Sequence, residues 1–68
     1  MNGISVPMDK LNYKHIYAIK RFARAFPTKM EGYIFLAKDA GVSLSSVQKA
    51  LSGKELSEQI INKIIKAL

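Results

Sequence analysis

One face of a short predicted helix, Leu44–Leu51, carries side chains that can recognise the edges of DNA bases. At 100° per residue, Ser45, Gln48 and Lys49 lie on one side of this helix, opposite the apolar Val47. A glutamine amide can pair with N6 and N7 of adenine, and a lysine ammonium can donate to O6 and N7 of guanine. A serine hydroxyl can serve several bases and is a weaker reader. The outer face of this helix therefore carries hydrogen-bonding groups of the kind that recognition of base edges requires.

The sequence offers few residues for other chemistry. It contains no cysteine, one histidine (His15) and five acidic residues, so disulfides are excluded and a metal site is hard to build. No Ser–His–acid or paired-carboxylate spacing stands out, and there is no glycine-rich phosphate loop. His15 falls towards the apolar side of its predicted helix, where we expect it to pack at the boundary of the core. We therefore expect no enzymatic activity, cofactor, metal or small-molecule ligand.

The charge balance is strongly basic, with eleven Lys or Arg against five Asp or Glu and a net charge of +6. Such an excess favours a polyanionic partner, either nucleic acid or an anionic membrane surface, although an ordinary soluble domain can also carry it. The predicted helix 10–26 gathers cations and tyrosines on one side. We expect Lys14, Tyr17 and Arg21 to contact DNA phosphates there. A solvated polar face is the alternative for each of these residues.

Start and stop signals divide the chain into four helical segments. Asp9 is a plausible N-cap for the first helix, and Pro27 ends it. Thr28 begins a capping box that starts the second helix, and Ser57 caps the last one. Because strand-like alternation is absent, the sequence predicts an all-α fold. The expected helices are 10–26, 29–40, 44–51 and 57–67.

We expect a single domain over residues 9–68, preceded by a flexible lead-in over residues 1–8. The lead-in contains no Arg or Lys, so it is not expected to bind the minor groove. It also lacks the basic start and long apolar run of a secretory signal, and the chain has no uninterrupted apolar run of about 18 residues. These features predict a cytoplasmic protein that does not bind a membrane.

The segment Tyr33–Ser52, YIFLAKDAGVSLSSVQKALS, has the spacing of a helix-turn-helix. Two helices that cross at about 90–120° with a short turn need a small residue where they approach, and Ala37 fills this position. Gly41 supplies a residue that tolerates positive φ, and Ser43 is a good N-cap for the second helix. The inward-facing apolar residues of the motif are Leu36, Ala40, Val42, Val47 and Ala50.

This segment resembles the lambda-repressor-like and lactose-repressor-like helix-turn-helix DNA-binding domains. Residues Ala37–Leu51, AKDAGVSLSSVQKAL, are particularly similar to the Cro repressors of phages, and the GVS of the turn is common in lactose-repressor-like proteins. The resemblance implies that Ser43 donates to a phosphate and that four residues of the following helix read base edges. These four residues are Leu44, Ser45, Gln48 and Lys49.

Two positions depart from the family's pattern. Phage repressors of this type often carry glutamine at the start of the motif and again at the first reading position of its second helix. There the two glutamines bridge a phosphate and an adenine. Here Tyr33 and Leu44 hold these positions. Tyr33 can still reach a phosphate through its hydroxyl, whereas Leu44 offers a methyl surface to thymine or packs inward. We also expect Lys54, in the loop after the motif, to contact a phosphate.

The last predicted helix has an apolar arc broader than the roughly 100° that one core-facing stripe needs. One part of this arc can close the core, and another can pair with a second copy around a two-fold axis. Such a homodimer would fit a pseudo-palindromic operator. A central core helix, covered on both sides, is the alternative. The residues expected at the dimer interface are Ile60, Ile61, Ile64, Ile65 and Leu68.

Together these features predict a sequence-specific regulator of transcription that binds double-stranded DNA, most simply a Cro-like repressor of phage, prophage or plasmid origin. A cationic, membrane-active helical bundle of the bacteriocin kind is a second hypothesis, because the chain is basic and 49% hydrophobic. The turn signature of Ala37, Gly41 and Val47 argues against it, since membrane activity does not require such a turn. A helical protein–protein interaction module is the third hypothesis.

Overall fold

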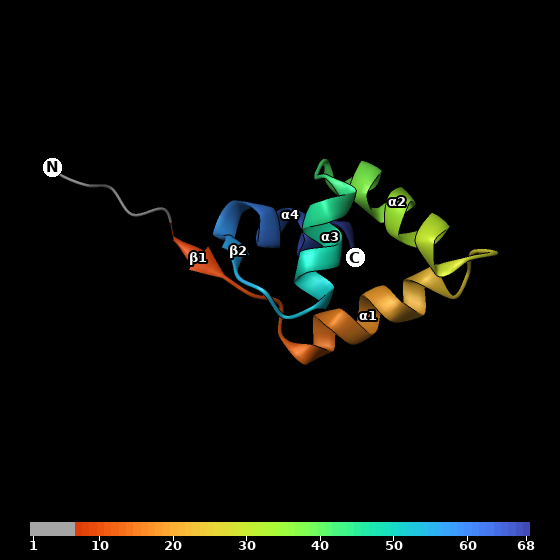
Figure 1. Cartoon of the computed structure of the whole chain (residues 1–68), viewed down its shortest axis with the longest axis horizontal. Helices are drawn as coiled ribbons and strands as arrows, with labels where there is room; N and C mark the ends of the chain where they lie inside the picture. The colour runs from red at the N-terminus through yellow and green to blue at the C-terminus, as the bar shows by residue number, and fades with distance from the viewer. Residues whose placement is uncertain (1–6) are drawn as a thin grey trace, which may run out of the picture.

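The computed structural model describes residues 7–68, which form four helices and one short pair of strands. The predicted all-α fold is confirmed, because the two strands are only two residues long each. In Figure 1, α1 and α2 form a V that closes at the right of the view. Helix α3 lies near the centre of the picture, between the two arms of the V, and α4 passes behind α3. The elements in chain order are β1 (Met8–Asp9), α1 (Tyr13–Ala23), α2 (Lys29–Ala40), α3 (Leu44–Leu51), β2 (Leu56–Ser57) and α4 (Glu58–Ala67).

Helix α1 is shorter than expected at both ends, so the predicted bounds 10–26 are wrong. Its N-cap is Asn12, whose side chain accepts a hydrogen bond from the N–H of His15 at 3.1 Å. Asp9 instead belongs to β1, and the chain between the two positions places Leu11 in the core at 4% exposure. At the other end the N–H of Phe26 donates to Ala23, three residues back, so the helix tightens into a turn before Pro27.

Helices α2 and α3 have the predicted bounds, because each boundary is set by a local signal. The Thr28 hydroxyl accepts from the N–H of Glu31 at 3.2 Å and caps α2. Gly41 ends α2 with φ of 73° and ψ of 33°, in a Schellman motif in which the N–H of Val42 donates to Ala37 at 2.9 Å. The Ser43 hydroxyl then accepts from Ser46 at 3.1 Å and caps α3. The turn between α2 and α3 therefore has the positive φ at Gly41 and the N-cap at Ser43 that the sequence predicts.

Close packing of α1 on α2 depends on Gly32. A Cβ at this position would lie 2.6 Å from the Cα of Ala23 and 2.9 Å from its Cβ, distances shorter than real contacts allow. The glycine therefore lets the end of α1 approach the start of α2. The core formed by all four helices contains Leu11, Ile19, Ala23, Leu36, Ala37, Val47, Ala50, Leu56, Ile61 and Ile64.

The start of the described chain is tied to the start of α4. Met8 pairs with Ser57 in the antiparallel β1–β2 bridge, and the N–H of Glu58 donates to the carbonyl of Pro7 at 3.0 Å. Residues 7 and 8 of the expected lead-in are thus hydrogen-bonded, and its residues 1–6 lie outside the described part of the chain. The bridge joins segments far apart in sequence, which explains why no local alternation indicated it.

Helix α4 closes the core, and this corrects part of the expected dimer interface. Ile61 and Ile64 are 1% and 0% exposed inside the protomer's own core, so they are not available to a second copy. Ile60 and Ile65 are half-buried against the same core. Only Leu68, of the five residues predicted, is exposed, at 40%. The broad apolar arc of α4 is therefore used mostly within one chain.

Candidate nucleic-acid interface

Helix α3 presents a polar row to solvent and an apolar row to the core. Val47 and Ala50 are both 0% exposed, and they fix the rotation of the helix about its axis. As a result Ser45, Gln48 and Lys49 are all exposed, on the side opposite the core. Leu44 is half-buried at the border, so only part of its methyl surface faces outward. The structure thus brings the predicted base-reading residues onto one accessible face.

Hydrogen bonds fix the backbone at both ends of α3. The hydroxyls of Ser43 and Ser46 lie 2.9 Å apart at its start, and either can be the donor. At its end, Gly53 has φ of 78° and the N–H of Lys54 donates to the carbonyl of Lys49 at 3.1 Å. This Schellman motif fixes the backbone of Lys54 directly after α3. Both Ser43 and Lys54 are exposed at positions where a phosphate can approach.

A small basic pocket lies where α1 ends and α2 begins. Lys20 and Arg24 reach it from α1, Lys29 and Tyr33 reach it from α2, and its volume is about 140 Å³. All four side chains carry hydrogen-bond donors, and three of them carry a positive charge. Cationic donors form short, strong hydrogen bonds with phosphate oxygens. We call this site the basic pocket; its lining fits a phosphate group.

The basic pocket and the outer face of α3 both reach the first turn of α2. The side-chain amide of Gln48 on α3 donates to the sulfur of Met30 on α2 at 3.9 Å. Met30 directly follows Lys29, which lines the pocket. Gln48 and the pocket therefore both contact the first turn of α2.

Helix α1 adds a row of phenols in line with the pocket. Tyr13, Tyr17, Lys20 and Arg24 follow one another at spacings of four, three and four residues, which places them on one stripe of the helix. Tyr13 is 77% exposed and Tyr17 is 57% exposed, unusually high values for such large side chains. Their hydroxyls are neutral donors to phosphate oxygens.

Only some of the residues expected to contact phosphates lie at or near the basic pocket. Tyr17 lies on the stripe that leads to the pocket, and Tyr33 lines the pocket itself. Lys14 and Arg21 are exposed but lie on the neighbouring stripe and do not line it. The pocket is also lined by three residues that were not among those expected to contact phosphates: Lys20, Arg24 and Lys29. Lys20 and Arg24 belong to the basic side of the predicted helix 10–26, but their convergence with Lys29 depends on how α1 packs on α2 rather than on local spacing.

Other kinds of site have little support in the described residues. Within residues 7–68 no three His, Cys, Asp or Glu side chains are grouped so that they could hold a metal ion. His15 is half-buried at the edge of the core, where its helical position placed it. None of the helices of residues 7–68 is long and apolar enough to cross a membrane.

A comparison with known proteins gives no match to a family model, to a curated protein or to a solved structure. The resemblance to Cro-like repressors therefore stays a prediction.

Proposed function

We propose that the chain is a sequence-specific regulator of transcription that binds double-stranded DNA through its helix-turn-helix. It acts as a Cro-like repressor of phage, prophage or plasmid origin in the bacterial cytoplasm, by occupying an operator. The observation that carries this proposal is that the exposed row of α3 and the basic pocket both reach the first turn of α2, where Gln48 contacts Met30 and Lys29 lines the pocket. One surface thus offers donors for bases and cations for phosphates.

In this proposal α3 enters the major groove, which is about 12 Å wide and accepts one helix. Gln48 keeps one amide N–H and its carbonyl oxygen free when the other N–H donates to Met30. These two free groups are the pair that adenine requires. Lys49 donates to guanine, and Ser45 and the exposed part of Leu44 add weaker contacts. With few strong readers, sequence preference resides mainly in Gln48 and Lys49.

The basic pocket supplies affinity and sets the orientation of α3. A backbone phosphate seated among Lys20, Arg24 and Lys29 releases condensed counterions, and this release strengthens binding to any sequence at low salt. Because the pocket sits at the junction of α1 and α2, it fixes the angle at which α3 meets the bases. Ser43 and Lys54 contact phosphates at the two ends of α3. Phosphate contacts position the protein, and base contacts specify the site.

A selection from random duplexes tests the proposal. The wild type should enrich a short common sequence, and its binding constant for that sequence should fall steeply as salt rises. The variant Lys49→Ala should lose preference at one base position, whereas Lys66→Ala on α4, an equal change of charge, should enrich the wild-type sequence. The same protein is added to anionic vesicles loaded with a dye. Vesicle leakage without DNA binding would favour the membrane-active alternative and overturn the proposal.

A further inference from the structure

Two tyrosine side chains of α1 project into solvent on the stripe that leads to the basic pocket. Tyr13 is 77% exposed and Tyr17 is 57% exposed, whereas Tyr33 is half-buried against the core. Ring surface that stays in water is apolar area, and a ligand that covers it gains binding free energy. We call Tyr13 and Tyr17 the tyrosine row. Both rings of the row are accessible to a ligand.

The spacing of the tyrosine row suits neighbouring bases of an extended strand. Four residues of an α-helix advance by about 6 Å along its axis. In a duplex, successive bases of one strand lie only about 3.4 Å apart and stack on one another, so a protein ring cannot reach their faces. An extended single strand exposes the face of each base, and stacking on an aromatic ring tolerates any base. The row therefore fits single-stranded nucleic acid better than duplex DNA.

Cations for the backbone of such a strand continue the same stripe. Lys20 follows Tyr17 by three residues, Arg24 follows Lys20 by four, and α1 contains no acidic residue. Lys20 and Arg24 line the basic pocket together with Lys29. From Tyr13 to Arg24 the stripe is about 16 Å long, which accommodates about three nucleotides at the spacing of the rings. Rings that hold bases and cations that follow the backbone are the two parts of a single-strand binding site.

We infer that the tyrosine row and the basic pocket together bind single-stranded nucleic acid. Neighbouring bases stack on Tyr13 and Tyr17, and the phosphates that follow them enter the basic pocket. Binding of this kind has little sequence preference, because every base has a face that can stack. The inference goes beyond the proposed function, and α3 takes no part in it. A single strand and a duplex compete for the basic pocket, since both place a phosphate there.

An anionic membrane surface would attract the same cations but requires a different kind of helix. An amphipathic helix that binds a membrane lays its apolar face into the lipid. The apolar face of α1 is already used within the chain, because Ile19 and Ala23 are 0% and 1% exposed. The tyrosine row stands on the charged face instead, in line with Lys20. These positions favour stacked bases over lipid tails as the cover of the rings.

Titration of the full chain with oligo-dT and with oligo-rU, each of about eight nucleotides, tests the inference. Tyrosine fluorescence reports stacking directly, because the chain contains three tyrosines and no tryptophan. At low salt the oligonucleotides should bind and quench part of the emission, and the tighter of the two identifies the preferred sugar. Binding to neither oligonucleotide would overturn the inference. The same holds if anionic vesicles bind the chain and neither oligonucleotide does.

Variants of the row show whether the rings supply the affinity, measured by the anisotropy of a labelled oligonucleotide. Tyr13→Ala and Tyr17→Ala should each weaken binding by about fivefold or more, which corresponds to about 1 kcal/mol for one stacked base. Tyr17→Phe keeps the ring and loses only the hydroxyl, so it should bind like the wild type. Phe35→Ala, which removes a 53% exposed ring from α2, is the matched control and should also bind like the wild type.

Two results would contradict the assignment of the strand to α1. If the double variant Tyr13→Ala/Tyr17→Ala keeps its helical circular dichroism spectrum and binds as tightly as the wild type, the rings do not hold the bases. If Lys49→Ala weakens binding of the oligonucleotides as much as the tyrosine variants do, the strand lies on α3. Failure of the proposed function is seen separately, as the absence of an enriched duplex sequence, and would leave binding of the oligonucleotides unchanged.

Discussion

Replacement of Gly32 by alanine tests the packing of α1 on α2, on which the basic pocket depends. In an exposed helix, Gly→Ala stabilises by about 1 kcal/mol. Here the new methyl group would lie 2.6 Å from the Cα of Ala23, which is backbone and cannot rotate away. The only relief is to move the end of α1 away from α2. The structure therefore predicts that the usual effect of this substitution is reversed.

The expected loss of folding stability follows from two opposing effects of Gly32→Ala. Forcing an extra methyl group into a packed interior costs about 1–3 kcal/mol, and a clash with backbone belongs at the upper end. The gain in helix propensity offsets about 1 kcal/mol of this cost. Gly32→Ala should therefore lower the free energy of unfolding by about 2 kcal/mol. For a domain of this size, each kcal/mol lowers the melting temperature by about 4–8 °C, so the expected fall is about 8–16 °C.

Thermal unfolding followed by circular dichroism measures this loss. Gly53→Asn is a suitable control, because its surroundings are open and asparagine tolerates the φ of 78° found there. It should change the melting temperature little. Adding Ala23→Gly to Gly32→Ala removes the 2.9 Å contact but not the 2.6 Å one, so the pair should cost less than the sum of the single changes. A Gly32→Ala variant that melts at or above the wild-type temperature would refute the reasoning.

Three further predictions follow from the caps, the core and the outer face of α3. Ser43→Ala removes the cap of α3 and should cost about 1 kcal/mol in urea unfolding, whereas Ser45→Ala on the exposed face should be nearly neutral. Ile64→Ala empties a fully buried site and should cost about 2–5 kcal/mol; a smaller loss would place this side chain outside the core. Lys49→Ala should relax preference at one base position by about 1–3 kcal/mol, whereas Lys20→Ala should weaken binding to all sequences alike. Equal effects of the two lysine variants would mean that α3 is not the reader.

Local signals allowed the helix-turn-helix to be predicted to the residue. Thr28, Gly41 and Ser43 each satisfy a backbone requirement within a few residues of their own position, through a cap or a positive φ. The spacing of Val47 and Ala50 likewise determines which side of α3 is buried. Three of the four predicted base-reading side chains, Ser45, Gln48 and Lys49, are exposed as a direct consequence, and Leu44 is half-buried at the border.

Features that depend on distant contacts could not be predicted in this way. The N-cap of α1 is Asn12 and not the predicted Asp9, because Met8 and Asp9 pair with Ser57 and Leu56, which lie far along the chain. The basic pocket was missed for the same reason, since its four residues meet only when α1 packs on α2.

The isoleucines of α4 show a different limit of sequence reasoning. An apolar arc on a helical wheel indicates burial, but it does not say whether the covering surface belongs to the same chain or to another. The structure places Ile61 and Ile64 against the protomer's own core. The more exposed apolar surface is Phe35, which a wheel of α2 alone does not connect with Phe22 and Phe26.

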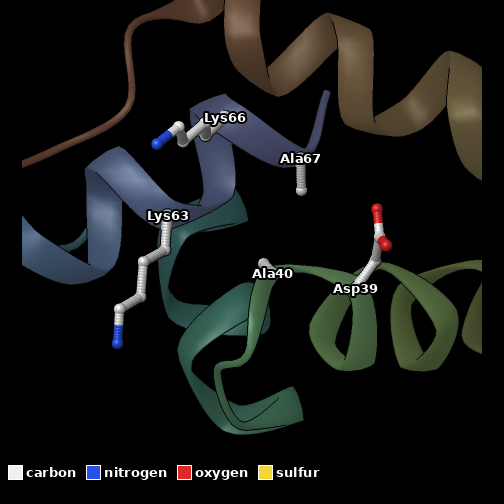
Figure 2. Close-up of a pocket in the computed structure, with 5 residues that line it drawn as sticks. All are labelled: Asp39, Ala40, Lys63, Lys66 and Ala67. Carbon is white, nitrogen blue, oxygen red and sulfur yellow. The ribbon is translucent and has the colours of Figure 1, made fainter.

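The central claim is that DNA contacts the side of the molecule shared by α3 and the basic pocket. The salt dependence of binding to one duplex tests it most directly, with two double variants that remove equal charge. Lys20→Ala/Arg24→Ala, in the pocket, should reduce the slope of log K against log salt by about 0.9, since the pocket holds one phosphate and each lost phosphate contact is worth about 0.9. Lys63→Ala/Lys66→Ala, beside the cavity between α2 and α4 shown in Figure 2, should leave the slope unchanged. Equal changes of slope in the two variants, or a larger change in the second, would contradict the account.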